Sequence, residues 1–241
     1  MRIVSYTFVS QHKSHTLLAV GNPWYIVASV GFCASNRPDE VPRVFQHALK
    51  DLEAESDDIE DYRLLARKVR DALFKAGLTA GFARSINSLA SLHEVMPKEL
   101  RDTRMMRRTE TPIEEHEKIG KALFRRIYGE TADSIQDLMN DIYPDLGWFN
   151  KSIIYGVNYG FTDILSPLET SYTMIAALTA TDNPRQIQWH LDGAQRGGAT
   201  LGEVQSIRTM SMKVAARSGI QWRNEIPKVG ESLVVAGGIG R

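Results

Sequence analysis

One histidine lies in a stretch of sequence that is suited to carry chemistry. The segment Pro184–Gly197, PRQIQWHLDGAQRG, is predicted to form a short helix. His190 follows Ile187 by three residues and precedes Ala194 by four, so the three side chains share one apolar face. The small residues Gly193 and Ala194 leave space beside the imidazole. This pattern is compatible with two roles for His190, a packed core histidine or the proton-transfer group of a site.

Two arginines and three aromatic residues are candidates for binding a small molecule. Arg185 and Arg208 lie on the histidine-bearing helix and on the next one, and either can grip a carboxylate or lie at the surface. Tyr155, Tyr159 and Trp189 can line a pocket or pack in a core or interface. With an imidazole titrating near neutral pH, this inventory suits a decarboxylation that needs no cofactor.

Other classes of chemistry lack their residues. Cys33 is the single cysteine, so there is no CxxC redox pair and no internal disulfide. The six histidines are scattered, and neither a metal-binding motif nor a nucleophile elbow occurs, so we expect no metal and no cofactor. The 29 basic residues are balanced by 29 acidic ones, so the chain has no net positive charge that would attract nucleic acid. No apolar run is long enough to cross a membrane.

The hydrophobic period is helical along most of the chain. No stretch alternates with a period of two for long enough to require a sheet, so we expect an all-α fold. Gly77 is placed to stop one long helix. The charged segment around Arg104, Arg107 and Arg108 has no apolar period and is expected to be a solvated linker. Capping boxes are predicted at three helix starts, namely Thr111 with Glu114, Ser166 with Glu169, and Thr200 with Glu203.

Three segments of the second half resemble a known family. They are GKALFRRIYGETADSI, YGVNYGFTDILSPLETSYTMIAALTA and QWHLDGAQRGGATLGEVQSI. In order, spacing and turn residues they resemble the carboxymuconolactone decarboxylase family, whose all-helical fold is shared with alkylhydroperoxidase-D-like proteins. The resemblance spans roughly Lys118–Val229. In the first half, only AGLTAGFARSINSLASLHEV is similar to the family's last helices.

The resemblance implies an alkylhydroperoxidase-D-like bundle made of two pseudo-repeats. We expect residues 1–22 to be a leader or extra segment, 23–100 a degenerate first repeat and 101–111 a linker. Residues 112–229 would form the carboxymuconolactone decarboxylase-like domain, and 230–241 a flexible tail. The family unit is small, and its members close their sites by oligomerising. We therefore expect a homo-oligomer, a trimer or a multiple of one.

The resemblance also assigns roles to single residues. It implies that His190 is a proton donor or relay that faces a cavity between subunits or repeats. The relay glutamate of the family falls at about Ser171, and the nearest acid is Glu169. Two positions turn a side chain by about 200°, so Glu169 is either a second site residue or only a helix cap. The peroxidase branch carries a CxxC pair where this chain has DNPRQIQ, which argues against thiol peroxidase activity.

These observations lead to one expected function and two alternatives. The expected function is a cofactor-free decarboxylase or related lyase that acts on a small carboxylated lactone or cyclic enone. The alternatives are an isomerase or cyclase of secondary metabolism, and a non-catalytic scaffold of the same fold. We expect a cytoplasmic protein. The first acidic residue is Asp39, and this acid-poor start is the reason for a mitochondrial alternative. The last residues do not form a Ser-Lys-Leu type of peroxisomal address.

Overall fold

A computed structural model describes residues 18–230, and within that range every regular element is helical. The all-α expectation is confirmed, whereas the alkylhydroperoxidase-D-like identity of the bundle stays a prediction. No helix in this part of the chain is long and apolar enough to cross a membrane. The expected tail lies almost wholly outside the described residues, as does most of the expected leader; the rest of the leader segment includes the short α1, Leu18–Gly21.

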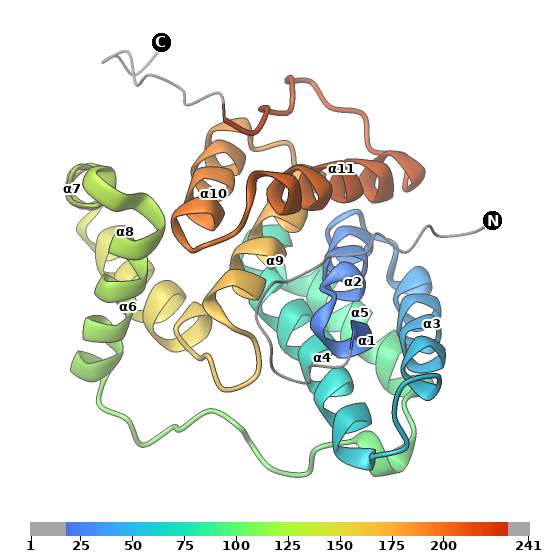
Figure 1. Cartoon of the computed structure of the whole chain (residues 1–241). Helices are drawn as coiled ribbons and strands as arrows, with labels where there is room; N and C mark the ends of the chain where they lie inside the picture. Colours follow the sequence, from blue (N-terminus) through green and yellow to red (C-terminus); the bar gives the residue numbers. More distant parts are fainter. Residues whose placement is uncertain (1–17, 231–241) are drawn as a thin grey trace.

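The helices follow one another in two groups (Figure 1). The first group comprises α1, α2 (Trp24–Ala34), η1 (Pro38–Glu40), α3 (Val41–Glu53), α4 (Ile59–Ala80), α5 (Phe82–Val95) and η2 (Lys98–Leu100). The second comprises α6 (Ile113–Tyr128), η3 (Gly129–Thr131), α7 (Ala132–Ile142), α8 (Pro144–Phe149), the π-helix η4 (Asn150–Tyr159), α9 (Pro167–Ala180), α10 (Pro184–Arg196) and α11 (Leu201–Arg217).

Helix α9 lies in the middle of the molecule and joins the two groups. It packs against α2 and α4 from the first group and against α10 and α11 from the second (Figure 1). All residues of α2 are buried, and so is α9 from Thr170 to Ala180, because both helices are rich in apolar and small residues on every side. The buried apolar side chains form one continuous core, so the two halves of the chain share it.

Two of the three predicted capping boxes are present. Ser166 and Thr200 each accept a hydrogen bond from the backbone N–H of the glutamate three residues on. The side chain of each glutamate in turn accepts a hydrogen bond from the backbone N–H of the cap residue. The prediction at Thr111 is wrong. Helix α6 begins at Ile113, and the residue at its N-cap is Pro112, which provides no side-chain hydrogen bond.

The predicted helix stop at Gly77 is also wrong. Helix α4 continues to Ala80 and ends at Gly81, whose φ of +100° is a conformation that favours glycine. A Cβ at Gly77 would come within 2.7 Å of the Phe82 ring. Gly77 therefore serves the tight turn of α4 against α5, and its place in the sequence marks packing rather than termination.

Helices α6 and η4 pack backbone to backbone. A Cβ at Gly120 would collide with the carbonyl oxygen of Lys151, and a Cβ at Gly156 would collide with the carbonyl oxygen of His116. Only glycine permits so close an approach at these two points. The crossing fixes the tyrosines of α6 and η4 against each other. A π-helical segment of this kind is frequent at functional sites.

Candidate active site

His190 lies in a closed aromatic environment. Helix α10 crosses α6 at Gly193, where a Cβ would come within 2.8 Å of the Ile127 side chain. This close crossing brings His190 to the end of α6, where its ring centroid is 6.1 Å from that of Tyr128. The residue is only 3% exposed, so the inward orientation predicted from the helical period is what the structure has.

Three of the predicted aromatic residues join His190 in this cluster. The Tyr128 and Tyr155 hydroxyls are 2.9 Å apart, in hydrogen-bonding contact. The ring of Tyr155 packs edge-on against that of Tyr159, at 5.3 Å between centroids. Trp189 lies 5.6 Å from the Tyr128 ring. We call Phe124, Tyr128, Tyr155, Tyr159, Trp189 and His190 the aromatic cluster.

Tyr128 is the central member of the cluster, and sequence reasoning missed it. It contacts Phe124, Tyr155, Trp189 and His190. The available signal was its position, because it ends the apolar face of α6 directly before the turn at Gly129.

Burial keeps the ionisable groups of the cluster uncharged. It lowers the pKa of His190 to about 4, and the buried Nδ1 atom has no hydrogen-bond partner within residues 18–230 to offset this. Burial raises the pKa of Tyr128 to about 12 and also raises the pKa values of Tyr155 and Tyr159. The expectation of an imidazole that titrates near neutral pH is therefore wrong. At that pH the cluster holds a neutral imidazole among protonated phenols.

Glu169 lies in a different group of side chains. Its carboxylate closes the capping box at Ser166 and accepts a hydrogen bond from Lys68, with a distance of 2.6 Å between Nζ and Oε1. Both side chains are mostly buried. The structure therefore gives Glu169 a structural role, as a cap and as an ion-pair partner across α4 and α9, and does not bring it into the aromatic cluster.

Near this ion pair a lysine is fully buried. Nζ of Lys75 donates to the Phe161 carbonyl at 2.7 Å and to Thr170 Oγ1 at 2.8 Å, and it lies 3.4 Å from the Asp71 carboxylate. Burial lowers the pKa of Lys75 to about 8. The helical spacing of Lys68, Asp71 and Lys75 was the signal for a shared face, but charges at such spacing usually lie at the surface.

The linker completes this buried charge group, contrary to expectation. Arg107 was expected on a solvated surface, yet it donates to Asp71 at 2.7 Å. Its guanidinium lies over the rings of Phe74 and Phe161, 4.5 Å from each centroid. Arg107 is drawn inward because the buried carboxylate of Asp71 requires a cationic partner. The hydrophobic pattern of the linker alone could not show this pairing.

The two arginines predicted to bind a carboxylate are placed elsewhere. Arg208 donates to the carbonyls of Ile226, at 2.7 Å, and Pro227, and so anchors the segment after α11. Arg185 is exposed in the first turn of α10, about 140° around the helix from His190. Neither arginine supplies the cluster with a positive charge.

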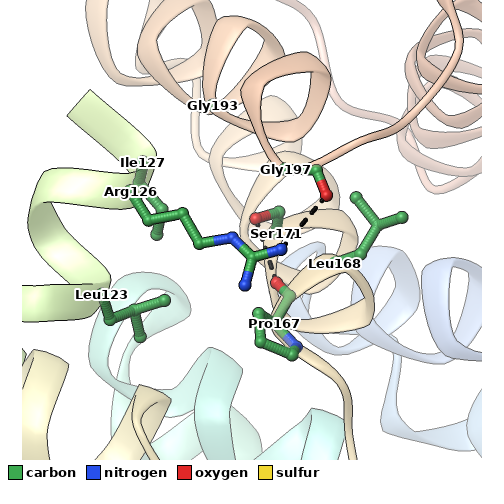
Figure 2. Close-up of a pocket in the computed structure, with 8 residues that line it drawn as sticks. All are labelled: Leu123, Arg126, Ile127, Pro167, Leu168, Ser171, Gly193 and Gly197. Carbon is green, nitrogen blue, oxygen red and sulfur yellow. Dashed lines mark hydrogen bonds between the residues drawn. The ribbon is translucent and has the colours of Figure 1, made fainter. Parts of the chain in front are cut away.

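Two cavities lie near the cluster, and His190 lines neither. The smaller, of about 10 Å³, has room for about one water molecule between α6, α9 and α10. In Figure 2 the Arg126 side chain points across it to the Gly197 carbonyl, a distance of 3.3 Å. Ser171, which stands where the resemblance places the relay glutamate, also lines it. A larger cavity of about 180 Å³ lies between α6, α7 and η4.

Within residues 18–230, no group of histidine, cysteine and acidic side chains could hold a metal ion. Cys33 is buried, and burial raises the pKa of its thiol. A buried thiol held protonated is a poor nucleophile.

Two curated proteins are similar to this chain over most of its length. The chain is 31% identical over 202 residues to a protein of Schizosaccharomyces pombe named Peroxisomal protein 2. The aligned region covers 84% of this chain and 90% of that protein. It is 26% identical over 262 residues to a Saccharomyces cerevisiae protein of the same name, covering 86% and 93%. No family model and no solved structure matches the chain.

The names of these relatives contradict the expected location. Both proteins are called peroxisomal, whereas the sequence led us to expect a cytoplasmic protein, with the mitochondrion as alternative. The mitochondrial alternative rested on the acid-poor start, a weak compositional signal, whereas the cytoplasmic expectation was only a default.

Proposed function

The chain belongs to the family of these two yeast proteins named Peroxisomal protein 2, and from this premise we propose that it is a peroxisomal, cofactor-free lyase. Its substrate is a small carboxylated lactone or cyclic enone, which loses CO2. The aromatic cluster around His190 carries out the proton transfer that replaces the lost carboxylate. The relatives' shared name supports the compartment, and the cluster's geometry supports the chemistry.

One observation carries the proposal. The imidazole of His190 is buried beside the ring of Tyr128, whose hydroxyl contacts that of Tyr155, and its Nδ1 has no hydrogen-bond partner among residues 18–230. An unpaired buried polar atom is costly, and such atoms in a folded protein call for an explanation. A site that binds a polar substrate atom gives one.

The chemistry needs donors rather than charge. When CO2 leaves a carbon conjugated to a carbonyl, the electron pair of the broken C–C bond spreads onto the carbonyl oxygen as an enolate. A neutral imidazole can donate its N–H to that oxygen, as neutral histidines do at other enolates. A phenol with a pKa of about 12, such as Tyr128, stays protonated at neutral pH and can return one proton to carbon. Solvent then replaces that proton.

A comparison of metabolites tests this function. Cells that express the wild-type chain, His190→Gln or Arg185→Gln as a matched surface control are compared for compounds that accumulate. We expect a carboxylated compound to accumulate with His190→Gln only, and purified wild type to release CO2 from it. If His190→Gln is stable and expressed at the wild-type level but no compound accumulates in its cells, the proposed lyase function is refuted.

The compartment is tested separately. The chain carrying a fluorescent protein at either end, or within the exposed linker at Met105, is imaged beside a peroxisomal marker. Overlap with the marker is expected for at least one fusion. Diffuse or mitochondrial signal from all three would contradict the peroxisomal assignment.

A second candidate is a non-catalytic scaffold of the same fold. Two observations favour it: His190 lines neither of the two cavities, and Glu169 is already engaged by Ser166 and Lys68. A scaffold predicts that His190→Leu, which is close in volume and has no polar side-chain atom, is at least as stable as wild type and fully functional in cells. A lyase predicts a stable variant with no activity.

We also propose that the chain forms a homo-oligomer, a trimer or a multiple of one. Five large apolar side chains, all at least 40% exposed, lie within eight residues at the end of α7 and along α8: Ile142, Tyr143, Leu146, Trp148 and Phe149. An exposed apolar patch of this kind is typical of a protein contact. We call it the α7–α8 patch.

A further inference from the structure

The larger cavity is a groove whose two walls carry opposite charges. It has a volume of about 180 Å³ and lies between α6, α7 and η4. Lys121 and Arg125 of α6 line one wall, together with Lys151 at the start of η4. Asp133 and Asp137 of α7 line the other. A volume of this size holds several water molecules, each of about 30 Å³, and so also a small organic ligand.

One cation of the basic wall has no ion-pair partner among the described residues. Arg125 pairs with Asp133 at 3.0 Å, and Lys151 pairs with Glu117 at 2.7 Å. Lys121 makes no ion pair with any residue in the range 18–230. Arg125 and Asp133 are both more than half exposed, so solvent screens their attraction and a competing anion can displace the aspartate.

Phe124 connects the groove to the aromatic cluster. This residue lines the groove and is 4% exposed. It also packs against Tyr128, with 4.2 Å between centroids, and against Tyr155, with 4.8 Å. A ligand that contacts Phe124 would therefore be separated from Tyr128 and Tyr155 by a single ring.

We propose that this groove binds small planar carboxylates. The carboxylate is held by Lys121 and Arg125, and the unsaturated body of the acid packs on Phe124. Charge-assisted hydrogen bonds supply the specificity for the anion, and the ring supplies the apolar contact. That this ligand is the substrate rests on the proposed lyase function, whereas binding in the groove does not.

Benzoate and benzamide are suitable probes, since they differ mainly in charge. Saturation-transfer NMR on the full chain gives the dissociation constant of each. We expect saturable benzoate binding in the millimolar range and benzamide binding about tenfold weaker, the ratio that one charge-assisted hydrogen bond provides. Equal affinities, or no saturable benzoate binding, would overturn the proposal.

Four variants locate the site. Lys121→Gln is expected to weaken benzoate binding about five- to tenfold. Asp133→Asn frees Arg125 and is expected to strengthen it. Lys118→Gln, an exposed position one turn away and paired with Glu115, is the control and leaves it unchanged. If Lys118→Gln weakens binding as much as Lys121→Gln, or Asp133→Asn also weakens it, the groove is not the site.

The fourth variant separates this proposal from the lyase function. His190→Gln should bind benzoate as tightly as wild type, because the imidazole does not line the groove. Normal binding by this variant with lost turnover supports both proposals. If the variants change benzoate binding as expected but the wild type shows no turnover, the lyase is refuted and the proposal of a binding groove stands. Loss of binding in His190→Gln, with the fold intact, contradicts the groove.

Discussion

At the scale of single residues, burial decides which groups can act. The imidazole of His190 is neutral at neutral pH because, in the described part of the chain, no partner of Nδ1 compensates for the loss of solvent. The positive charge of Lys75 is retained at the same pH because two oxygens and the Asp71 carboxylate surround it. The first group is suited to hydrogen bonding with a substrate. The second is satisfied by the protein and serves to join α4 to α9.

The neutral state of His190 predicts a pH dependence. Its pKa is about 4 when folded and about 6.5 when unfolded, so the unfolded chain binds more protons between these values. Stability is therefore full above pH 6.5 and falls as the pH drops towards 4. From pH 7.5 to 5 the wild type should lose about 2 kcal/mol relative to His190→Gln in urea unfolding. Parallel curves for the two proteins would contradict a buried neutral imidazole.

Lys75 predicts a slope of the same sign at higher pH. Its folded pKa of about 8 lies below the unfolded value near 10.5, so the unfolded chain again binds more protons in that window. Stability rises with pH above 8. Between pH 8 and 9 the wild type should gain about 1 kcal/mol relative to Lys75→Met, measured by denaturant unfolding. The exposed control Lys118→Met should show no such gain, and an equal gain in it would refute the interpretation.

At the scale of the elements, periodicity and capping chemistry could be read from the sequence. The inward side of α10 and the caps at Ser166 and Thr200 follow from spacings of three and four residues, which are local. The partners across α4 and α9 could not be read in this way. Lys75 and Arg107 are polar residues in charged segments, and only the tertiary contacts with Asp71 explain their burial.

Glycines illustrate the same limit. Gly77 and Gly120 both lie where helices touch, and a single sequence does not distinguish a contact glycine from a terminating one. Gly156 lies in the π-helical η4 and is likewise a contact glycine, since it meets the His116 carbonyl of α6.

The α6–η4 crossing predicts a large effect from one methyl group. Gly120→Ala would drive a Cβ into the backbone carbonyl of Lys151, which cannot move as a side chain does. We expect a loss of about 3 kcal/mol or more in thermal or denaturant unfolding. Gly202→Ala in α11, where no atom lies within 4 Å of the new Cβ, is the control and should be neutral or stabilising by up to about 1 kcal/mol. Similar stabilities for the two variants would refute the close crossing.

At the scale of the whole molecule, the shared core holds the two halves of the chain together, whereas the exposed α7–α8 patch is suited to contact another subunit. The two halves of the chain cannot act as separate bodies, since α9 packs against helices of both. Helices α7 and α8, whose residues form the patch, lie beside α6 on the side of the molecule away from α3 (Figure 1). A partner subunit bound there would leave the shared core untouched.

The patch predicts a change of mass in solution. Light scattering should give the wild type three times the mass of one chain, or a multiple of that. The double variant Trp148→Ser, Phe149→Ser should shift towards one chain mass, because it removes exposed apolar surface. Ile86→Ser, at an equally exposed position on α5, should leave the mass unchanged. A wild type with the mass of one chain would contradict the oligomer.

The most direct test of the central claim is deuterium incorporation by the purified protein in D2O. Carboxylated butenolides and cyclohexenones serve as substrates, and NMR detects the product. The account predicts CO2 release with one deuterium at the carbon that lost the carboxylate. It also predicts rates about a hundredfold or more lower in Tyr128→Phe and His190→Gln, both folded as judged by circular dichroism. No CO2 release by the wild type from any of these substrates, or equal release by all three proteins, would contradict it.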